Sequence, residues 1–252
     1  MVSNTAISVD IIILSYAKNE ALKKLTEQTI SSCLASEDPN EINFNIVVIE
    51  SNRALNPYQF DNTTTIYPEK KFGFHRYLNI GVKHTSNEYV CLCNNDLIFH
   101  KNWASNILTS MKDDESFLSA STFCPIMHNN GNFGENTGIF DGYESLFSGW
   151  CFMVKRQIFE KIGILDEKFE FWYADADFLK TLRANGIKNF LVTNAVVTHL
   201  NAVTSKSLTR KERFAFTLLP QLYFNYKWKR DSYLKYKFKL LYFNLMYLLR
   251  IN

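Results

Sequence analysis

Three continuous apolar runs in the first hundred residues constrain the fold of this chain more than any other feature. They occupy Val9 to Leu14, Ile46 to Ile49 and Tyr89 to Cys93 and are rich in β-branched residues. Runs that do not alternate with polar residues are typical of strands covered on both faces, as in a parallel sheet. Apolar residues at helical spacing lie between them, at Ala21 to Leu34 and Phe74 to Lys83. The sequence therefore predicts a doubly wound α/β fold.

The elements predicted after residue 120 are shorter. Ser121 to Gly149 is dense in Gly and Asn, which predicts a loop with short strand pieces. The elements expected after it are a strand at SGWCFMV, a short helix at Arg156 to Ile162, a helix from about Asp175 to Asn185 ended by Gly186, and short apolar runs at Phe190 to Val192 and Ala195 to Val197.

Charge is distributed unevenly along the 252 residues. Residues 206–252 hold eleven basic and two acidic residues, a net charge of +9, which leaves −6 for residues 1–205. A hydrophobic content of 46% suits one globular domain with an appendage, and the asymmetry indicates a change of role near residue 205. The five cysteines lie mostly in apolar runs without zinc-site spacing, so we expect reduced core residues.

Polar residues follow each of the three apolar runs, where open parallel sheets bind their ligands. These segments are Ser15 to Glu20, Glu50 to Asn52 and Asn94 to Asp96. No GxGxxG or GxxxxGK[ST] motif adjoins them, so a bound phosphate would need another source of positive charge. A divalent cation held by Asp96 would supply it. The alternative is that this segment is only a turn.

Two further sites carry candidate chemistry. Helical periodicity aligns Asp175 with the apolar Phe178 and Leu182, which predicts that Asp175 points inward, where burial would favour a general base. The alternative is that Asp175 or Asp177 only caps the helix. His199 ends an apolar run and is either a metal ligand or a core imidazole.

Read in order, these segments resemble family 2 of the inverting glycosyltransferases, which have the GT-A fold. The resemblance covers about residues 9–205 and rests on VDIIILSYAKNEAL, VVIESN, Gly73 with LNIGVKHTSNEYVCLCNND, the block from GWCFMV to LRANGIK, and VVTHLN. It implies a single doubly wound, mostly parallel sheet flanked by helices in residues 1–205. The nucleotide-sugar half is expected at about 1–100 and the acceptor half at about 101–205, followed by a helical basic and aromatic extension at 206–252.

The resemblance also implies roles for individual residues. A nucleotide-diphosphate sugar is expected to contact Ser15, Tyr16, Asn19, Glu50, Asn52, Gly73, Asn79 and Asn95, with Glu50 on the ribose or base. Asp96 and His199 are expected to bind Mn²⁺ or Mg²⁺, Asp175 to deprotonate the acceptor hydroxyl with inversion, and Trp150, Trp172 and Asp177 to lie on the acceptor side. Three positions depart from the family pattern: Asn94 in place of the first acid of DxD, Glu50 in place of Asp, and Ala174 in place of an acid.

The expected donor carries a hexosyl or deoxyhexosyl group, and the expected acceptor is a glycan or a lipid-linked glycan, as in polysaccharide biosynthesis. A non-catalytic carbohydrate-binding or scaffold subunit is the main alternative. A nucleotidyltransferase would be expected to carry a Gly-rich basic loop where this chain has SYAKNEAL.

The extension at 206–252 alternates basic residues with Tyr, Phe and Leu, and its longest nearly uncharged stretch is too short to span a bilayer. It is either an interfacial amphipathic helix on anionic lipid or a set of helices packed on the domain. We expect a cytoplasmic protein, peripheral to the inner face of the membrane under the first interpretation, and no nucleic-acid partner.

Overall fold

The protein is described here by a computed structural model, which covers residues 6–128, 138–141, 146–200 and 214–248. Strands β1 (Ile7–Ser15), β2 (Ile42–Glu50), β3 (Thr64–Ile66) and β4 (Tyr89–Asn94) are mutually parallel, in the order β3-β2-β1-β4. The sheet continues through β8 (Cys151–Lys155), β6 (Ser119–Phe123), β9 (Asn189–His199) and β5 (Leu97–Phe99), with β7 (Ile139–Asp141) paired to β9. Strands β1 to β4, β6 and β9 run one way and the other three run against them, so the predicted mostly parallel sheet is confirmed.

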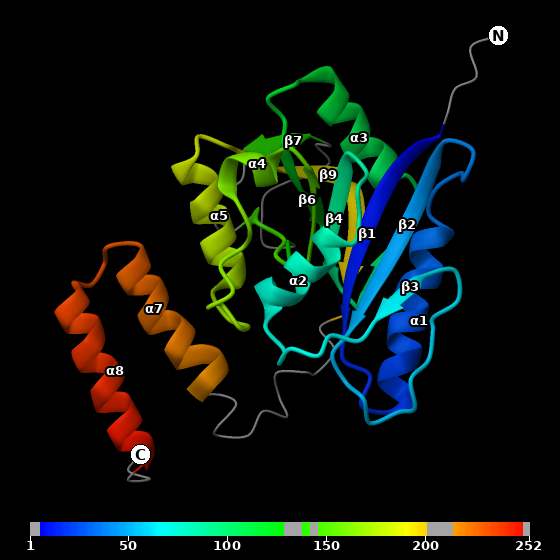
Figure 1. The fold of residues 1–252 in the computed structure, drawn as a ribbon. Coiled ribbons are helices and arrows are strands. Elements are labelled where there is room, and N and C mark those ends of the chain that lie inside the picture. Colours follow the sequence, from blue (N-terminus) through cyan, green and yellow to red (C-terminus); the bar gives the residue numbers. More distant parts are fainter. Residues whose placement is uncertain (1–5, 129–137, 142–145, 201–213, 249–252) are drawn as a thin grey trace.

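Helices cover both faces of the sheet, as Figure 1 shows. Alternate residues of β1 enter different layers: Ile11 and Ile13 pack with α1 (Glu20–Leu34) and α3 (Trp103–Asp113), and Ile12 packs with α2 (Phe74–Lys83), α4 (Ile158–Ile162) and α5 (Ala174–Ala184). Burial on both faces is the reason that the run is apolar throughout. Gly81 of α2 lies so close to Ile12 that a Cβ atom there would clash with its side chain.

Two elements after residue 170 bear on the sequence prediction, and the first of them differs from it. The apolar runs at Phe190 to Val192 and Ala195 to Val197 belong to one strand, β9, because Thr193 continues it, hydrogen-bonded through its side chain to Gly138. A register shift in the β6–β9 pairing accommodates the two polar residues between the runs. The helix predicted at Asp175 ends as expected, with Gly186 in a left-handed conformation at φ +69°.

The C-terminal extension forms a helical hairpin, α7 (Leu219–Lys227) and α8 (Tyr233–Leu248), after a π-helical turn at Phe214–Leu218. Helix α7 packs on the domain through Phe224, which lies with Phe169 and Ala174, whereas no residue of α8 is buried. In Figure 1 the hairpin lies at the side of the domain, with α8 outermost. Within the described residues, no helix has the length and apolar character needed to cross a bilayer. All five cysteines are buried free thiols.

His75 of α2 is buried and should make stability depend on pH. Its side chain is packed edge-on against Phe169, its Nδ1 lies 3.0 Å from the carbonyl oxygen of Asp166, and burial lowers its pKa from 6.5 to about 4. Between these two values the unfolded chain binds more protons than the folded protein, so acidification favours unfolding.

We therefore expect the free energy of unfolding to fall by about 2 kcal/mol through His75 between pH 7.5 and pH 5. Urea denaturation at the two pH values measures the total change. His75→Gln removes the titrating group, so its loss of stability over the same range should be smaller by about that amount. An equal loss in both proteins would show that His75 contributes nothing.

Candidate functional site

A chain of polar side chains joins the ends of β2, β1 and β4 at one edge of the sheet. Ser15 Oγ donates a hydrogen bond of 2.7 Å to Glu50 Oε2 and lies 3.0 Å from Thr26 Oγ1. Asn95 Nδ2 donates to the same Thr26 oxygen at 2.9 Å. The parallel register brings these strand ends together, as the sequence predicted.

Glu50 organises the loops after β1 and β2. It is 1% exposed, and its carboxylate accepts four hydrogen bonds, from Ser15 Oγ, Ala17 N, Asn52 N and the Tyr58 hydroxyl. Burial and then the bond to Glu50 raise the pKa of Tyr58. Glu50 thus fixes the backbone that a nucleoside would meet, and its own contact with the ribose or base stays a prediction.

The other predicted donor contacts occupy different environments. Tyr16 is 39% exposed at the end of β1, and Asn19 caps α1 by accepting from Leu22 N at 3.0 Å. Asn52 Oδ1 accepts from Ala54 N in a tight turn. Of these three residues, Tyr16 and Asn19 are exposed and Asn52 is half-buried.

Gly73 and Asn79 belong to α2 and its approach. Gly73 is the N-cap of α2, whereas Asn79 is 4% exposed and brackets Leu165, donating to its carbonyl at 2.9 Å and accepting from its N–H at 3.0 Å. Asn79 therefore anchors the ILDEKF turn, and its predicted donor contact has no open surface in this arrangement.

Asp96 and His199 meet at the junction of β5 and β9. The antiparallel register pairs Leu97 with His199, and Leu200 N donates to the carbonyl of Asp96 at 2.9 Å. Side-chain atoms His199 Nε2 and Asp96 Oδ1 lie 3.2 Å apart, with both side chains at most 14% exposed. Two residues that are 103 positions apart in the sequence are thus brought into contact by strand pairing.

Trp150 covers His199 as a parallel stack, with ring centroids 5.2 Å apart at an interplanar angle of 4°. Trp150 Nε1 and His199 Nδ1 are buried and have no hydrogen-bond partner in the described part of the chain. Buried polar atoms are nearly always paired. These orphaned atoms, beside a carboxylate and an imidazole, fit a site that is completed by a bound group.

Asp175 packs against Gly149, at the start of the segment that carries Trp150. A Cβ atom built on Gly149 would lie 2.6 Å from Asp175 Cβ, so only glycine fits there. The Asp175 side chain therefore lies against Gly149, the residue that immediately precedes Trp150 in the sequence. Asp175 is exposed, and its Oδ1 accepts from Ala176 N at 2.8 Å.

The predicted orientations of the two aspartates are wrong. Asp175 is exposed and Asp177 is 2% exposed, because the surface of α5 that carries Asp177 is covered by α7. Lys227 Nζ lies 2.8 Å from Asp177 Oδ1 and Trp228 Nε1 donates to the same oxygen at 2.9 Å. Asp177 thus anchors α7. Because its side chain is buried there, Asp177 has no surface that could face an acceptor. Neither aspartate is the N-cap of α5, since that residue is Tyr173.

A family model described as Glycosyl transferase family 2 matches residues 10–166, more than half of the chain. The chain belongs to this glycosyltransferase family. Its fold is GT-A, as in two solved structures. GalNAc-T7 with UDP, GalNAc and Mn²⁺ has a TM-score of 0.62 at 12% identity, over 79% of this chain and 44% of that one. TarS 1-349 of S. aureus has a TM-score of 0.55 at 14% identity, over 75% of this chain and 58% of that one.

No curated relative matches the sequence. The chain spans about half the length of the two solved chains. Its similarity to them is therefore one of fold.

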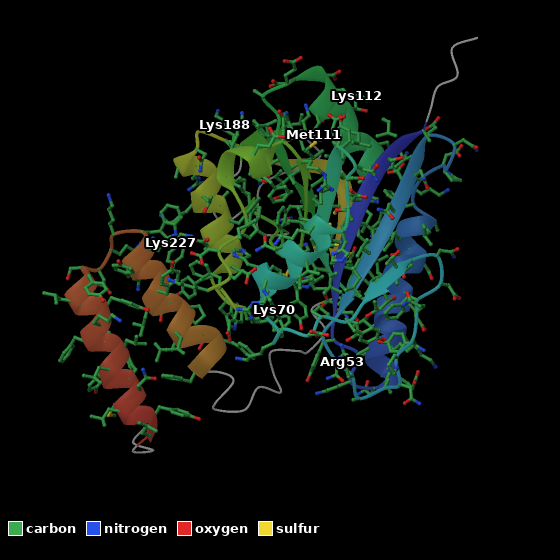
Figure 2. All side chains as sticks on the ribbon, in the orientation of Figure 1. Arg53, Lys70, Met111, Lys112, Lys188 and Lys227 are labelled. Carbon is green, nitrogen blue, oxygen red and sulfur yellow. The ribbon has the colours of Figure 1, made fainter. Side chains whose placement is uncertain are left out.

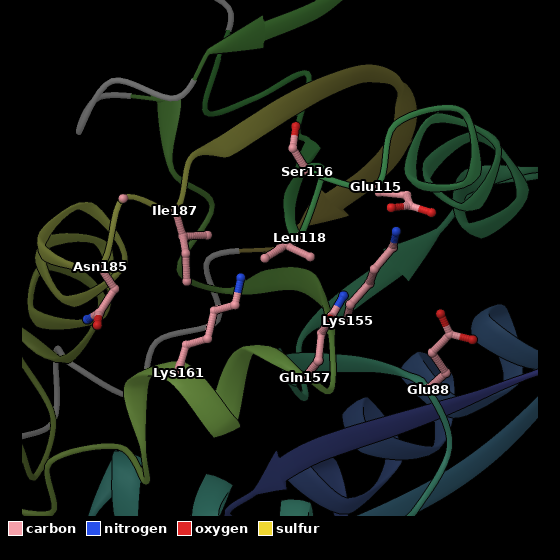
Figure 3. Close-up of a pocket in the computed structure, with 10 residues that line it drawn as sticks. Glu88, Glu115, Ser116, Leu118, Lys155, Gln157, Lys161, Asn185 and Ile187 are labelled. Carbon is pink, nitrogen blue, oxygen red and sulfur yellow. The ribbon is translucent and has the colours of Figure 1, made fainter.

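A hollow of about 500 Å³ lies at the opposite end of the glycosyltransferase sheet (Figure 3). Glu88, just before β4, and Lys155, the last residue of β8, line it together with Gln157 and Lys161. Lys155 Nζ donates to the carbonyl of Met111 at 2.7 Å, so that cation stabilises the fold. The hollow lies away from the strand ends that carry Asp96 and is a separate surface feature.

Four residues that sequence reasoning did not single out shape the glycosyltransferase site. Thr26 joins Ser15 to Asn95, Tyr58 completes the hydrogen bonds of Glu50, Gly149 admits Asp175, and Lys227 neutralises Asp177. The SGW sequence before a strand was the one available signal, since glycine beside a strand often marks close approach. The others act through partners distant in sequence.

Proposed function

We propose that this glycosyltransferase is an inverting, metal-dependent enzyme. It moves a hexosyl or deoxyhexosyl group from a nucleotide-diphosphate sugar to a hydroxyl of a glycan or lipid-linked glycan. One arrangement carries the proposal: Asp96 and His199 lie 3.2 Å apart at the end of the sheet, and Asp175 packs against Gly149, the residue before the Trp150 that stacks on His199.

Asp96 and His199 would hold Mn²⁺ or Mg²⁺. A carboxylate oxygen and an imidazole nitrogen at this separation suit neighbouring positions of one coordination sphere, and such ions commonly take only one or two carboxylates besides substrate phosphates. No cluster of three or more ligand side chains occurs among the described residues, which agrees with a site completed by the donor. When bound, the cation would stabilise the charge of the departing diphosphate. Asn94 offers a neutral oxygen in the same segment.

Asp175 would take the acceptor proton. The acceptor oxygen forms its bond to the anomeric carbon, the bond to the diphosphate oxygen breaks, and the hydroxyl proton passes to the Asp175 carboxylate. Direct displacement on the face opposite the leaving group inverts the anomeric centre, whereas retention by a covalent route would need a second nucleophile beneath that carbon. The exposure of Asp175 leaves it accessible to an acceptor.

The donor site is tested by thermal unfolding with UDP, GDP, dTDP and CDP, each with and without Mn²⁺. A nucleotide bound at a hundredfold excess over its Kd should raise the Tm by about 5–10 °C. We expect one nucleotide to stabilise the protein only with Mn²⁺. The effect should disappear in Asp96→Ala and in His199→Ala, because each variant removes one ligand.

Asp113→Ala is the matched control, since Asp113 is an exposed carboxylate at the end of α3. It should respond as the wild type does. Equal stabilisation with and without Mn²⁺, or a full response in Asp96→Ala, would contradict the proposed metal site.

A non-catalytic carbohydrate-binding or scaffold subunit would be favoured if Asp175 lay far from the donor-side residues. The contact of Asp175 with Gly149 supports the enzyme instead, because it holds the exposed carboxylate of the first turn of α5 against the segment that leads into Trp150.

A further inference from the structure

Helix α8 carries two apolar stripes, and one of them already has a partner. Tyr236 stacks on Tyr226 of α7 with ring centroids 4.9 Å apart, and Tyr247 stacks on Phe214 at the same separation. Leu240, between them on this side, lines the groove of about 890 Å³ that separates α8 from the domain. This stripe accounts for the packing of α8.

The second stripe, which we call the outer stripe, faces solvent. Its residues are Leu234, Phe238, Leu241, Leu245 and Leu248, and their exposed fractions are 80%, 70%, 68%, 51% and 74%. Alternating steps of four and three residues place all five on one side of a helix. Figure 2 shows side chains projecting from α8 on the side away from α7. Exposed apolar surface of this regularity is unusual in a monomer and indicates an interaction site.

Basic residues border the outer stripe. Lys237 lies on one flank, at the helical position next to Leu234 and Leu241, and Lys235 lies on the other flank beside Phe238. The helix contains no acidic residue, and Lys229 and Arg230 are exposed just before it. Asp231 pairs with Lys235 and Lys239 at 2.6 Å each. The surface around the outer stripe is therefore positive.

We propose that the outer stripe of α8 inserts into the interface of an anionic lipid bilayer, with the flanking lysines at the level of the head groups. An exposed apolar stripe bordered by lysines is the pattern of a helix lying in the plane of a membrane. A second copy of the chain would set the same positive flanks against each other without an acidic residue in either α8. An anionic surface supplies the missing negative charge.

The proposal concerns α8 alone and is independent of the metal, the base and the donor. It places the catalytic domain against a membrane through the hairpin, because α7 is fixed to α5 by the contact between Lys227 and Asp177. A lipid-linked acceptor would then diffuse in the same plane as the enzyme.

Sedimentation of the full chain with vesicles tests this surface. We expect binding to vesicles of phosphatidylcholine and phosphatidylglycerol at 3:1, and binding at least tenfold weaker to phosphatidylcholine alone. Leu241→Asp/Leu245→Asp should weaken binding to the anionic vesicles by at least about tenfold, because both side chains leave the apolar layer. Raising KCl from 0.1 to 0.5 M should weaken wild-type binding, since the lysines are screened.

Ile126→Asp/Ile139→Asp is the matched control. These side chains are 59% and 50% exposed and lie outside α8, so the pair makes the same change of charge on another surface. It should bind anionic vesicles as the wild type does, and far-ultraviolet circular dichroism should show that both variants are folded.

Three results would overturn the proposal. The first is a wild type that sediments with neither vesicle, and the second is a Leu241→Asp/Leu245→Asp variant that binds as well as the wild type. The third is a wild-type dimer that becomes a monomer in that variant by light scattering, which would assign the outer stripe to a second copy of the chain.

Discussion

Asp175→Asn should reduce the rate of glycosyl transfer by about 10² to 10⁴-fold while leaving donor binding intact. The amide keeps the size of the side chain and can still contact Ala176 N and Gly149, but it does not accept the acceptor proton. The rate is measured by release of the nucleoside diphosphate in the presence of acceptor, using the nucleotide class found by thermal unfolding.

The control is the stabilisation by nucleotide and Mn²⁺, which should equal that of the wild type because Asp175 is not a proposed metal ligand. Asp113→Asn provides a second control at an exposed carboxylate. The wild-type product should have the anomeric configuration opposite to that of the donor by proton magnetic resonance. Undiminished transfer by Asp175→Asn would eliminate this residue as the base.

Lys227→Met should destabilise the protein by about 3 kcal/mol, because it leaves a buried carboxylate without its cation. Lys227 Nζ lies 2.8 Å from Asp177 and 3.0 Å from Asp166, so the substitution removes the cation that both carboxylates share. Figure 2 shows Lys227 on the side of α7 that faces the domain. Chemical denaturation at pH 7.5 measures the loss.

Asp177→Leu/Lys227→Met separates the charge effect from lost packing. With the carboxylate gone, most of the stability should return, since a buried ion pair can be replaced by apolar residues at little cost. Burial already raises the pKa of Asp177 against the opposing effect of Lys227. In Lys227→Met the defect should therefore shrink as the pH falls, because a protonated Asp177 needs no cation. If Lys227→Met is as stable as the wild type, the pair of Lys227 and Asp177 does not stabilise the packing of α7 on the domain.

The sequence pattern predicted the elements of the first hundred residues closely and the later elements only in part. The bounds of α2 agree residue for residue, because its apolar face and its N-terminal Gly73 are both visible in the sequence. The direction of β8 was not predictable, since a short apolar strand reads alike in either orientation. The division of β9 into two runs failed because Thr193 has a polar partner, Gly138, across the loop.

In the candidate site, too, local sequence did not reveal contacts between residues that are distant in the sequence. Asp96 and His199 were paired through family resemblance, and the strand register brings them together. Periodicity alone misplaced Asp175 and Asp177, because it assumes one apolar side per helix. Helix α5 is covered on a second side by α7, whose Lys227 and Trp228 make a buried carboxylate favourable. Partners 50 residues away leave no trace in an eleven-residue window.

The absence of a side chain at Gly149 identifies a position that does not tolerate substitution. A Cβ atom at residue 149 would lie 2.6 Å from Asp175 Cβ, so α5 can approach the segment before β8 this closely only because that residue is glycine. Efforts to redirect the proposed activity to new acceptors should therefore diversify the exposed surface around Trp172, on the predicted acceptor side, and hold residue 149 constant, since even one methyl group there would displace the carboxylate that we propose as the base.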